Sequence, residues 1–153
     1  INLATFKALK ANATPMALSE VFTALQQGTV DGQDNPIGNV YAYRYYEVQK
    51  YITLTGHQWA GIMLMINDKL WNQIPEDYQK IMVEAAKEAE TWQRKEINAR
   101  EGEFLEEMKQ AGMEVTILTP DEKSQFQELM KAIWTEFEDT VGKDIVQAVI
   151  NTK

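Results

Sequence analysis

Few side chains in this sequence have the type and spacing that chemistry requires. Two pairs of acids stand close together, Asp31 with Asp34 and Glu106 with Glu107, but acids spaced in this way usually form a solvated face rather than an acid–base couple. His57 is the only histidine and cysteine is absent, which excludes thiol catalysis, thiolate metal sites and disulfides. No nucleophile motif, glycine-rich phosphate loop or metal-ligand spacing occurs. We therefore expect no catalytic residue, no metal site and no cofactor, and so no enzyme.

The polar loop over residues 29–36 is the segment best suited to binding a small molecule. An Asp-Gly and an Asn-Pro dipeptide punctuate it, and loops that follow strands often carry sites. Asn35 has a side-chain amide that can donate hydrogen bonds to a carboxylate. Asparagine before proline also shapes turns, so from the residues alone both roles for Asn35 stay open.

The elements that would position this loop follow from apolar periodicity, caps and breakers. The pattern predicts a helix around residues 3–9 followed by a short strand, then a helix 19–27 that Ser19 caps and Gly28 ends, and a very short strand at Val30. Strands are predicted at 51–55, 60–66 and 113–118. A helix 75–112 is predicted with Pro75 at its first position, and another helix from Pro120, opened by a capping box on Thr119 and Glu122. The helix 75–112 would be about 50 Å long, which is longer than one domain of this size needs and predicts that it spans two packed bodies. Tryptophans and methionines at helical spacing are interpreted as core.

Composition narrows the class of protein. With 153 residues and 44% hydrophobic side chains the chain can bury a core. Its formal net charge of -8 argues against nucleic acid and against an anionic membrane surface, since both recruit clustered Lys and Arg. No apolar run approaches the roughly 20 residues of a bilayer span, and no signal peptide opens the chain. A start at Ile1 within an expected helix favours a cut or trimmed chain.

Two motifs resemble a known family. The first is SEVFTALQQGTVDGQDNP, from Ser19 to Pro36, and the second is EVQKYITLTGH, from Glu47 to His57. In order and spacing they resemble the extracytoplasmic solute receptors of TRAP transporters, the DctP-like family. The resemblance extends over essentially the whole chain, through the later Ile-Asn pair and Trp71 to the long helix that begins at Pro75.

The resemblance implies an α/β, two-lobed periplasmic-binding-protein-like fold. This chain would supply the second lobe, the long helix between the lobes and the C-terminal tail. Its parts would be a ligand-binding segment with the DGQDNP loop (1–58), a crossing strand and short helix (59–74), the long helix (75–112), and a strand with C-terminal helices (113–153).

Four ligand-binding residues are implied by the resemblance. Asn35 falls on the family's ligand-contacting asparagine, and His57 on a histidine of the polar network around the ligand, with a structural histidine at a strand end as the alternative. Leu18 falls where related receptors carry an aromatic lid, with a helix-entry contact as the alternative. Gln33 is a loop-shaping residue and a candidate for supporting the site. The arginine that clamps the ligand carboxylate in the family lies upstream of the region matched here.

The implied function is capture of a small organic acid in the periplasm and its delivery to the permease subunits of a TRAP transporter. The lobes would close on the ligand by hinge motion, with no nucleic-acid partner. Two alternatives stay open: a helical interaction module built on the long helix, and an enzyme acting on sugar acids or keto acids. An uncovered apolar face on the long helix would also favour self-association.

Overall fold

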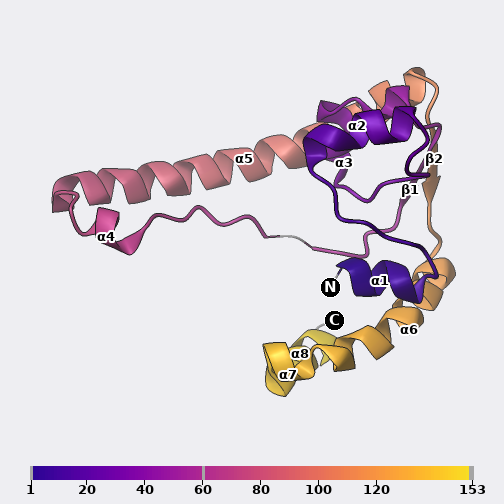
Figure 1. Ribbon diagram of the computed structural model, residues 1–153. Coiled ribbons are helices and arrows are strands. Elements are labelled where there is room, and N and C mark those ends of the chain that lie inside the picture. Colours follow the sequence, from indigo (N-terminus) through magenta and orange to yellow (C-terminus); the bar gives the residue numbers. More distant parts are fainter. Residues whose placement is uncertain (1, 60, 152–153) are drawn as a thin grey trace. The chain divides into compact units, whose positions relative to one another are not determined.

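The computed structural model, drawn in Figure 1, describes residues 2–59 and 61–151. These residues divide into two compact units, which are considered separately. The first unit comprises Ile1–Val30, Ile52–His57 and Thr116–Lys153, and the second comprises Asp31–Tyr51 and Gln58–Val115. The chain passes between the units four times, so neither unit is a continuous stretch of sequence.

The first unit is mostly helical. It contains α1 (Asn2–Ala8), α2 (Leu18–Gln26), α6 (Pro120–Glu136), α7 (Glu138–Val141) and α8 (Lys143–Asn151). α1 packs against α6, as Figure 1 shows. Thr5 on α1 and Met130 and Ile133 on α6 are buried.

The second unit is organised around one long helix. It contains α3 (Ile37–Ala42), a 3-10 turn η1 (Tyr45–Glu47), α4 (Asp68–Trp71) and α5 (Glu76–Gln110), which is 35 residues long. α3 packs against α5. Two short strands, β1 (Tyr51–Leu54) and β2 (Glu114–Ile117), pair as a two-stranded sheet, and the division between the units falls within both of them.

The helix ends explain why α5 and α6 form where the sequence predicts them. Acids in the first turn of α5 and Lys109 in its last turn stabilise the helix, because their charges interact favourably with the partial charges at its two ends. The prediction that Pro75 is the first residue of this helix is wrong: α5 begins at Glu76, and Pro75 is its N-cap. Thr119 and Glu122 form the predicted capping box of α6. α5 continues without interruption through Gly102, and no described atom beyond the neighbouring helix backbone lies within 4 Å of the place where a Cβ would be at this residue.

Three predicted strands and one predicted cap are wrong. Residues 11–17 and Val30 form neither helix nor strand, because no neighbouring strand pairs with them among the described residues. Residues 61–66 are extended and exposed rather than a buried strand; Ala60 lies outside the described residues. Ala17, not Ser19, is the N-cap of α2, while Gly28 ends that helix at φ +69° as predicted.

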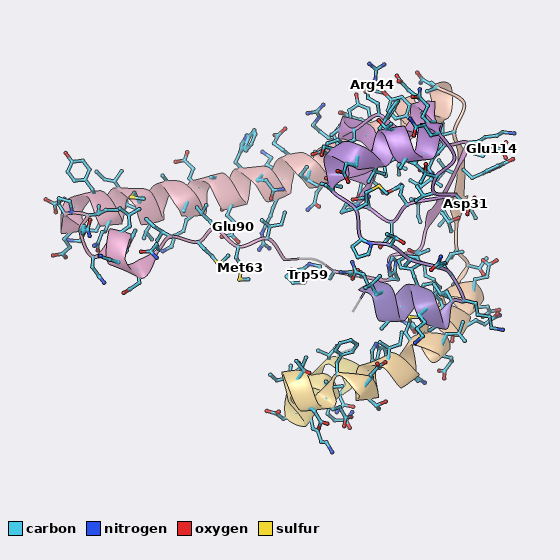
Figure 2. All side chains as sticks on the ribbon, in the orientation of Figure 1. Asp31, Arg44, Trp59, Met63, Glu90 and Glu114 are labelled. Atoms are coloured by element: carbon cyan, nitrogen blue, oxygen red, sulfur yellow. The ribbon has the colours of Figure 1, made fainter. Side chains whose placement is uncertain are left out.

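The interpretation of tryptophans as core is wrong for two of the four. Trp92 on α5 is exposed, and Trp59 projects with Met63 from the extended segment before α4 (Figure 2). The core of the second unit lies instead at the end of α5 and under α3, where Val40, Tyr45 and Met108 are fully buried. No helix among the described residues has the length and hydropathy to cross a membrane.

Candidate functional site

The loop that carries Asn35 is fixed at both ends by backbone geometry. α2 ends at Gln26, and Gly28 adopts the left-handed conformation that turns the chain out of the helix. Asp31, labelled in Figure 2, opens the second unit. Pro36 closes the loop as the N-cap of α3, with φ −57° and ψ 149°. The proline therefore sets both the end of the loop and the start of the helix.

Three side-chain amides meet around Asn35. Its Nδ2 donates to Gln33 Oε1 at 2.7 Å, and Asn39 Nδ2 donates to its Oδ1 at 3.4 Å. Gln33 and Asn35 lie two residues apart and are half-buried, whereas Asp34 between them is exposed, so the two amides share a side of the loop. All three amide residues are half-buried, which leaves part of their surface open to a small ligand. The structure thus brings together two of the four predicted site residues, Gln33 and Asn35.

Aromatic packing holds α3 on the last turns of α5. The ring of Tyr41 on α3 stacks on Phe104 with centroids 4.3 Å apart, and the guanidinium of Arg100 lies 4.9 Å from the Phe104 centroid on the same helix. Tyr41 Oη donates to a Glu107 carboxylate oxygen at 2.6 Å. This hydrogen bond, followed by burial, raises the pKa of the Tyr41 hydroxyl. Because α3 carries Asn39 and follows Asn35, the stack positions the amide group of the loop.

The Glu106–Glu107 pair has structural partners in the second unit. Glu107 accepts the Tyr41 hydroxyl, and Glu106 pairs with Lys109 at 3.3 Å. Burial raises the pKa of Tyr45, which is fully buried behind α3. Within the described residues no cluster of acids or histidines has the arrangement of a metal site.

His57 lies in the first unit, at the end of the segment that follows β1. Its Nδ1 is 2.6 Å from Thr55 Oγ1. The Phe6 ring of α1 meets the imidazole edge-on at a centroid distance of 6.1 Å, and the Phe126 ring of α6 is 5.6 Å away. The imidazole is half-buried and its Nε2 is a buried atom. Two rings and one hydroxyl therefore determine how this histidine is oriented.

Leu18 is also in the first unit, as the first residue of α2. Its side chain is exposed to a third of its area or more, while the inward positions of the same helix, Val21, Ala24 and Leu25, are buried. An exposed apolar side chain at a helix start can cover a bound molecule or contact another segment of chain. Leu18 and His57 are thus described in one unit, and Gln33 and Asn35 in the other.

Sequence reasoning missed three residues of these surroundings. Asn39 is four residues after Asn35, and the two side chains meet because Pro36 between them is the N-cap of a helix that begins at Ile37. Thr55 is two residues before His57, and Gly56 between them has φ +57°, a left-handed turn across which the hydroxyl and the imidazole meet. Phe126, in contrast, meets His57 through packing across the unit, and no local pattern signals it.

The group of amides can offer hydrogen-bond donors to an oxygen-rich ligand. An asparagine amide has two N–H donors, of which Gln33 accepts one. A carboxylate accepts such bonds well, because a charged acceptor strengthens them.

Comparison with known proteins identifies similar sequences and folds. The sequence profile of the bacterial extracellular solute-binding proteins, family 7 (DctP), matches residues 1–140. The 2,3-diketo-L-gulonate-binding periplasmic protein YiaO of Escherichia coli (strain K12) is 33% identical over 147 residues, which cover 96% of this chain and 43% of that protein.

Two solved structures match nearly the whole chain. A TRAP periplasmic solute-binding protein from Sulfurospirillum deleyianum with bound succinate superposes with a TM-score of 0.90 at 34% identity, over 99% of this chain and 51% of that one. One from Polaromonas bound to D-erythronate gives a TM-score of 0.90 at 33% identity, over 99% and 50%. The expected fold class, that of a two-lobed receptor, is confirmed, and this chain spans about half the length of the proteins it matches.

Proposed function

The chain belongs to the DctP family, the bacterial extracellular solute-binding proteins of family 7, and on this premise we propose that it forms part of a receptor for a small organic acid. The observation that carries the proposal is the match of 99% of the chain to a TRAP receptor solved with succinate. A second solved relative holds D-erythronate, which also carries a carboxylate. The ligand class is therefore a small carboxylate, with or without hydroxyl groups.

In the proposed site Asn35 donates from Nδ2 to an oxygen of the acid. Gln33 supports the Asn35 amide through the 2.7 Å hydrogen bond. By the family resemblance, Leu18 and His57, both in the first unit, are proposed as two further ligand-binding residues, the first as apolar cover and the second as part of a polar network; Thr55 Oγ1 lies 2.6 Å from His57 Nδ1. The main charge-assisted contact would come from an arginine upstream of the region matched here, since a guanidinium binds a carboxylate in bidentate fashion. High affinity then requires the receptor at the full length of its relatives.

The proposed receptor works outside the cytoplasm. Members of its family are periplasmic or otherwise extracellular binding proteins. We place this receptor in the periplasm and propose that it passes its acid to the permease subunits of a TRAP transporter. Closure of the two lobes around the acid would mark the loaded state that the permease recognises.

The two alternative functions have less support. The family is one of binding proteins rather than enzymes, and an acid recovered unchanged after long incubation would agree with that. A helical interaction module has no use for three amides gathered beside a loop. The organic-acid receptor accounts for this group of side chains.

Residues 1–153 on their own are proposed to self-associate. The segment 61–66 consists of glycine and five apolar side chains, and Ile62 and Leu64 are 97% and 87% exposed. The first half of α5 adds exposed apolar side chains, including Ile81 and Trp92. Apolar surface of this extent usually marks a place where another surface binds.

Thermal melting with a panel of acids tests the receptor proposal. The panel is succinate, D-erythronate, galactonate and a keto acid, and each is added to residues 1–153 and to the receptor at the full length of its relatives. A ligand that binds only the folded state raises Tm in proportion to the logarithm of its concentration. We expect a rise for the full-length receptor and little or none for residues 1–153. If no acid raises Tm in either protein, the proposed function is wrong.

A further inference from the structure

The amides of Gln33, Asn35 and Asn39 form a continuous chain of hydrogen bonds. Asn39 donates to Asn35 at 3.4 Å, and Asn35 donates to Gln33 at 2.7 Å. The backbone makes this arrangement possible, because Gln33 and Asn35 lie two residues apart on one side of the loop and Asn39 follows in α3, four residues after Asn35. All three lie within one compact unit.

We propose that Gln33 and Asn39 are positioning residues that fix the orientation of the Asn35 amide, with its NH₂ group toward Gln33 and its oxygen toward α3. The site would therefore present a hydrogen-bond donor to the ligand, and so select an oxygen acceptor such as a carboxylate. This inference rests on the proposed function, in which Asn35 contacts the acid. Asn39 then acts on the ligand only through Asn35.

The orientation of Asn35 depends on both neighbours at once. Rotation of its amide alone by half a turn would bring Oδ1 against Gln33 Oε1 at a distance where two acceptors repel. It would also bring two NH₂ groups together on the Asn39 side. The chain of amides can reverse its direction only if all three side chains rotate, so the three behave as one unit.

The two hydrogen bonds contribute unequally to the orientation of the Asn35 amide. The bond to Gln33, at 2.7 Å, is at the short end of the usual range, whereas the bond from Asn39, at 3.4 Å, is longer than that range. Gln33 therefore provides most of the orientation in this structure. A carboxylate in place of the Asn39 amide would compete with the Gln33 oxygen for the Asn35 NH₂ group, because a charged acceptor attracts that group more strongly than a neutral one.

Two matched substitutions separate orientation from charge. Gln33→Glu and Asn39→Asp each replace an NH₂ group by oxygen with almost no change of shape, and each adds one negative charge near Asn35. Gln33→Glu keeps an acceptor facing Asn35 Nδ2 and preserves the orientation. Asn39→Asp puts an acceptor where a donor stood and turns the Asn35 NH₂ group toward α3.

The first measurement needs no ligand. In the full-length receptor labelled with ¹⁵N-asparagine, nuclear Overhauser contacts of the Asn35 NH₂ protons report which neighbour they face. We expect contacts to the Gln33 side chain in the wild type and in Gln33→Glu, and contacts to the residue 39 side chain in Asn39→Asp. Wild-type NH₂ protons that face Asn39, or an unchanged pattern in Asn39→Asp, would overturn the assignment.

The second measurement is binding of succinate or D-erythronate, whichever raises Tm more, to the same proteins at low and high salt. Asn39→Asp should weaken binding about tenfold more than Gln33→Glu, since it alone turns the donor away. Equal losses that vanish at high salt would attribute both effects to charge and refute the positioning role. If neither acid binds while the contact pattern is as expected, the proposed function fails and the amide orientation stands.

Discussion

At the scale of single residues, Asn35 and His57 differ in what surrounds them. Asn35 is bonded to other amides, and a ligand oxygen can join or replace such a bond at small cost because the interaction is of the same kind. His57 faces two phenyl rings and a hydroxyl, and its Nε2 is buried. We therefore propose direct ligand contact for Asn35 and a shaping role for His57.

Thr55 should determine the tautomer of His57. A separation of 2.6 Å is typical of a hydroxyl donor rather than an N–H donor, so we expect the Thr55 hydroxyl to donate to Nδ1, which leaves the ring proton on Nε2. Long-range ¹H–¹⁵N correlation at a pH where imidazole is neutral reports the tautomer, and the single histidine makes the signal unambiguous. Thr55→Val should mix the tautomers, whereas Thr53→Val, at an exposed position of β1, should not. An Nδ1–H tautomer in the wild type would contradict this prediction.

At the scale of elements, the site depends on a short helix that its own sequence does not stabilise. α3 has only six residues and includes Gly38, so its helical state needs packing. Tyr41 provides that packing through Phe104 and Glu107 on α5, the latter 66 residues away. The loop with Asn35 is therefore held in place by a helix that lies much later in the sequence.

The capping box of α6 should contribute measurable stability. Thr119→Ala removes the side-chain acceptor for Glu122 N–H and should lower the free energy of unfolding by about 1 kcal/mol. The hydrogen bond from the Thr119 backbone N–H, and then that from its hydroxyl, lower the pKa of Glu122. Because its pKa is lower in the folded state, the Glu122 carboxylate stabilises the folded state above the unfolded pKa of glutamate. This stabilisation is lost as the pH falls through the folded pKa.

Urea unfolding between neutral and acidic pH checks the capping prediction. The part of the free energy of unfolding that is lost at acidic pH through Glu122 should be absent from Glu122→Gln. It should be retained in Asp121→Asn, which removes the same charge from the same turn. Equal pH profiles for these two substitutions would show that general charge, not the capping box, causes the loss.

The sequence predicts what local signals encode. Proline, acids and the Thr119–Glu122 pair mark α5 and α6, and Gly28 marks the end of α2. α3 was missed because it depends on the packing of Tyr41 against α5, and the role of Asn39 was missed because it depends on α3 being helical. Residues 60–66 were predicted as a buried strand because they form an apolar run of strand length between turn-forming residues. Burial also needs a partner, which the described residues do not supply for 61–66. The proposed roles of Asn35, His57, Leu18 and Gln33 stay predictions.

At the scale of the whole molecule, the chain spans about half the length of the proteins it matches. The second unit exposes apolar side chains along residues 61–66 and along the first half of α5. A core built from this chain alone leaves these side chains in water, at a cost of roughly 25 cal/mol per Å² of apolar surface. Such a surface favours association with another protein surface.

Leu64→Lys should reduce self-association of residues 1–153. Sedimentation velocity over a range of concentrations should show oligomers in the wild type and fewer in the variant, because a lysine in the centre of the segment 61–66 disfavours its burial. Gln58→Lys adds the same charge at an exposed polar position outside that segment and should leave the oligomers unchanged. A wild-type chain that is monomeric at every concentration would refute the prediction.

Calorimetric titration of an organic acid into the full-length receptor, wild type and Asn35→Ala, tests the central claim most directly. The titrant is the acid of the panel that raises Tm most. We expect one binding site in the wild type and a loss of roughly tenfold to a hundredfold in affinity in Asn35→Ala, since a buried oxygen of the acid loses its donor. The same affinity in both proteins would remove Asn35 from the site, and the absence of binding heat with every acid would contradict the receptor itself.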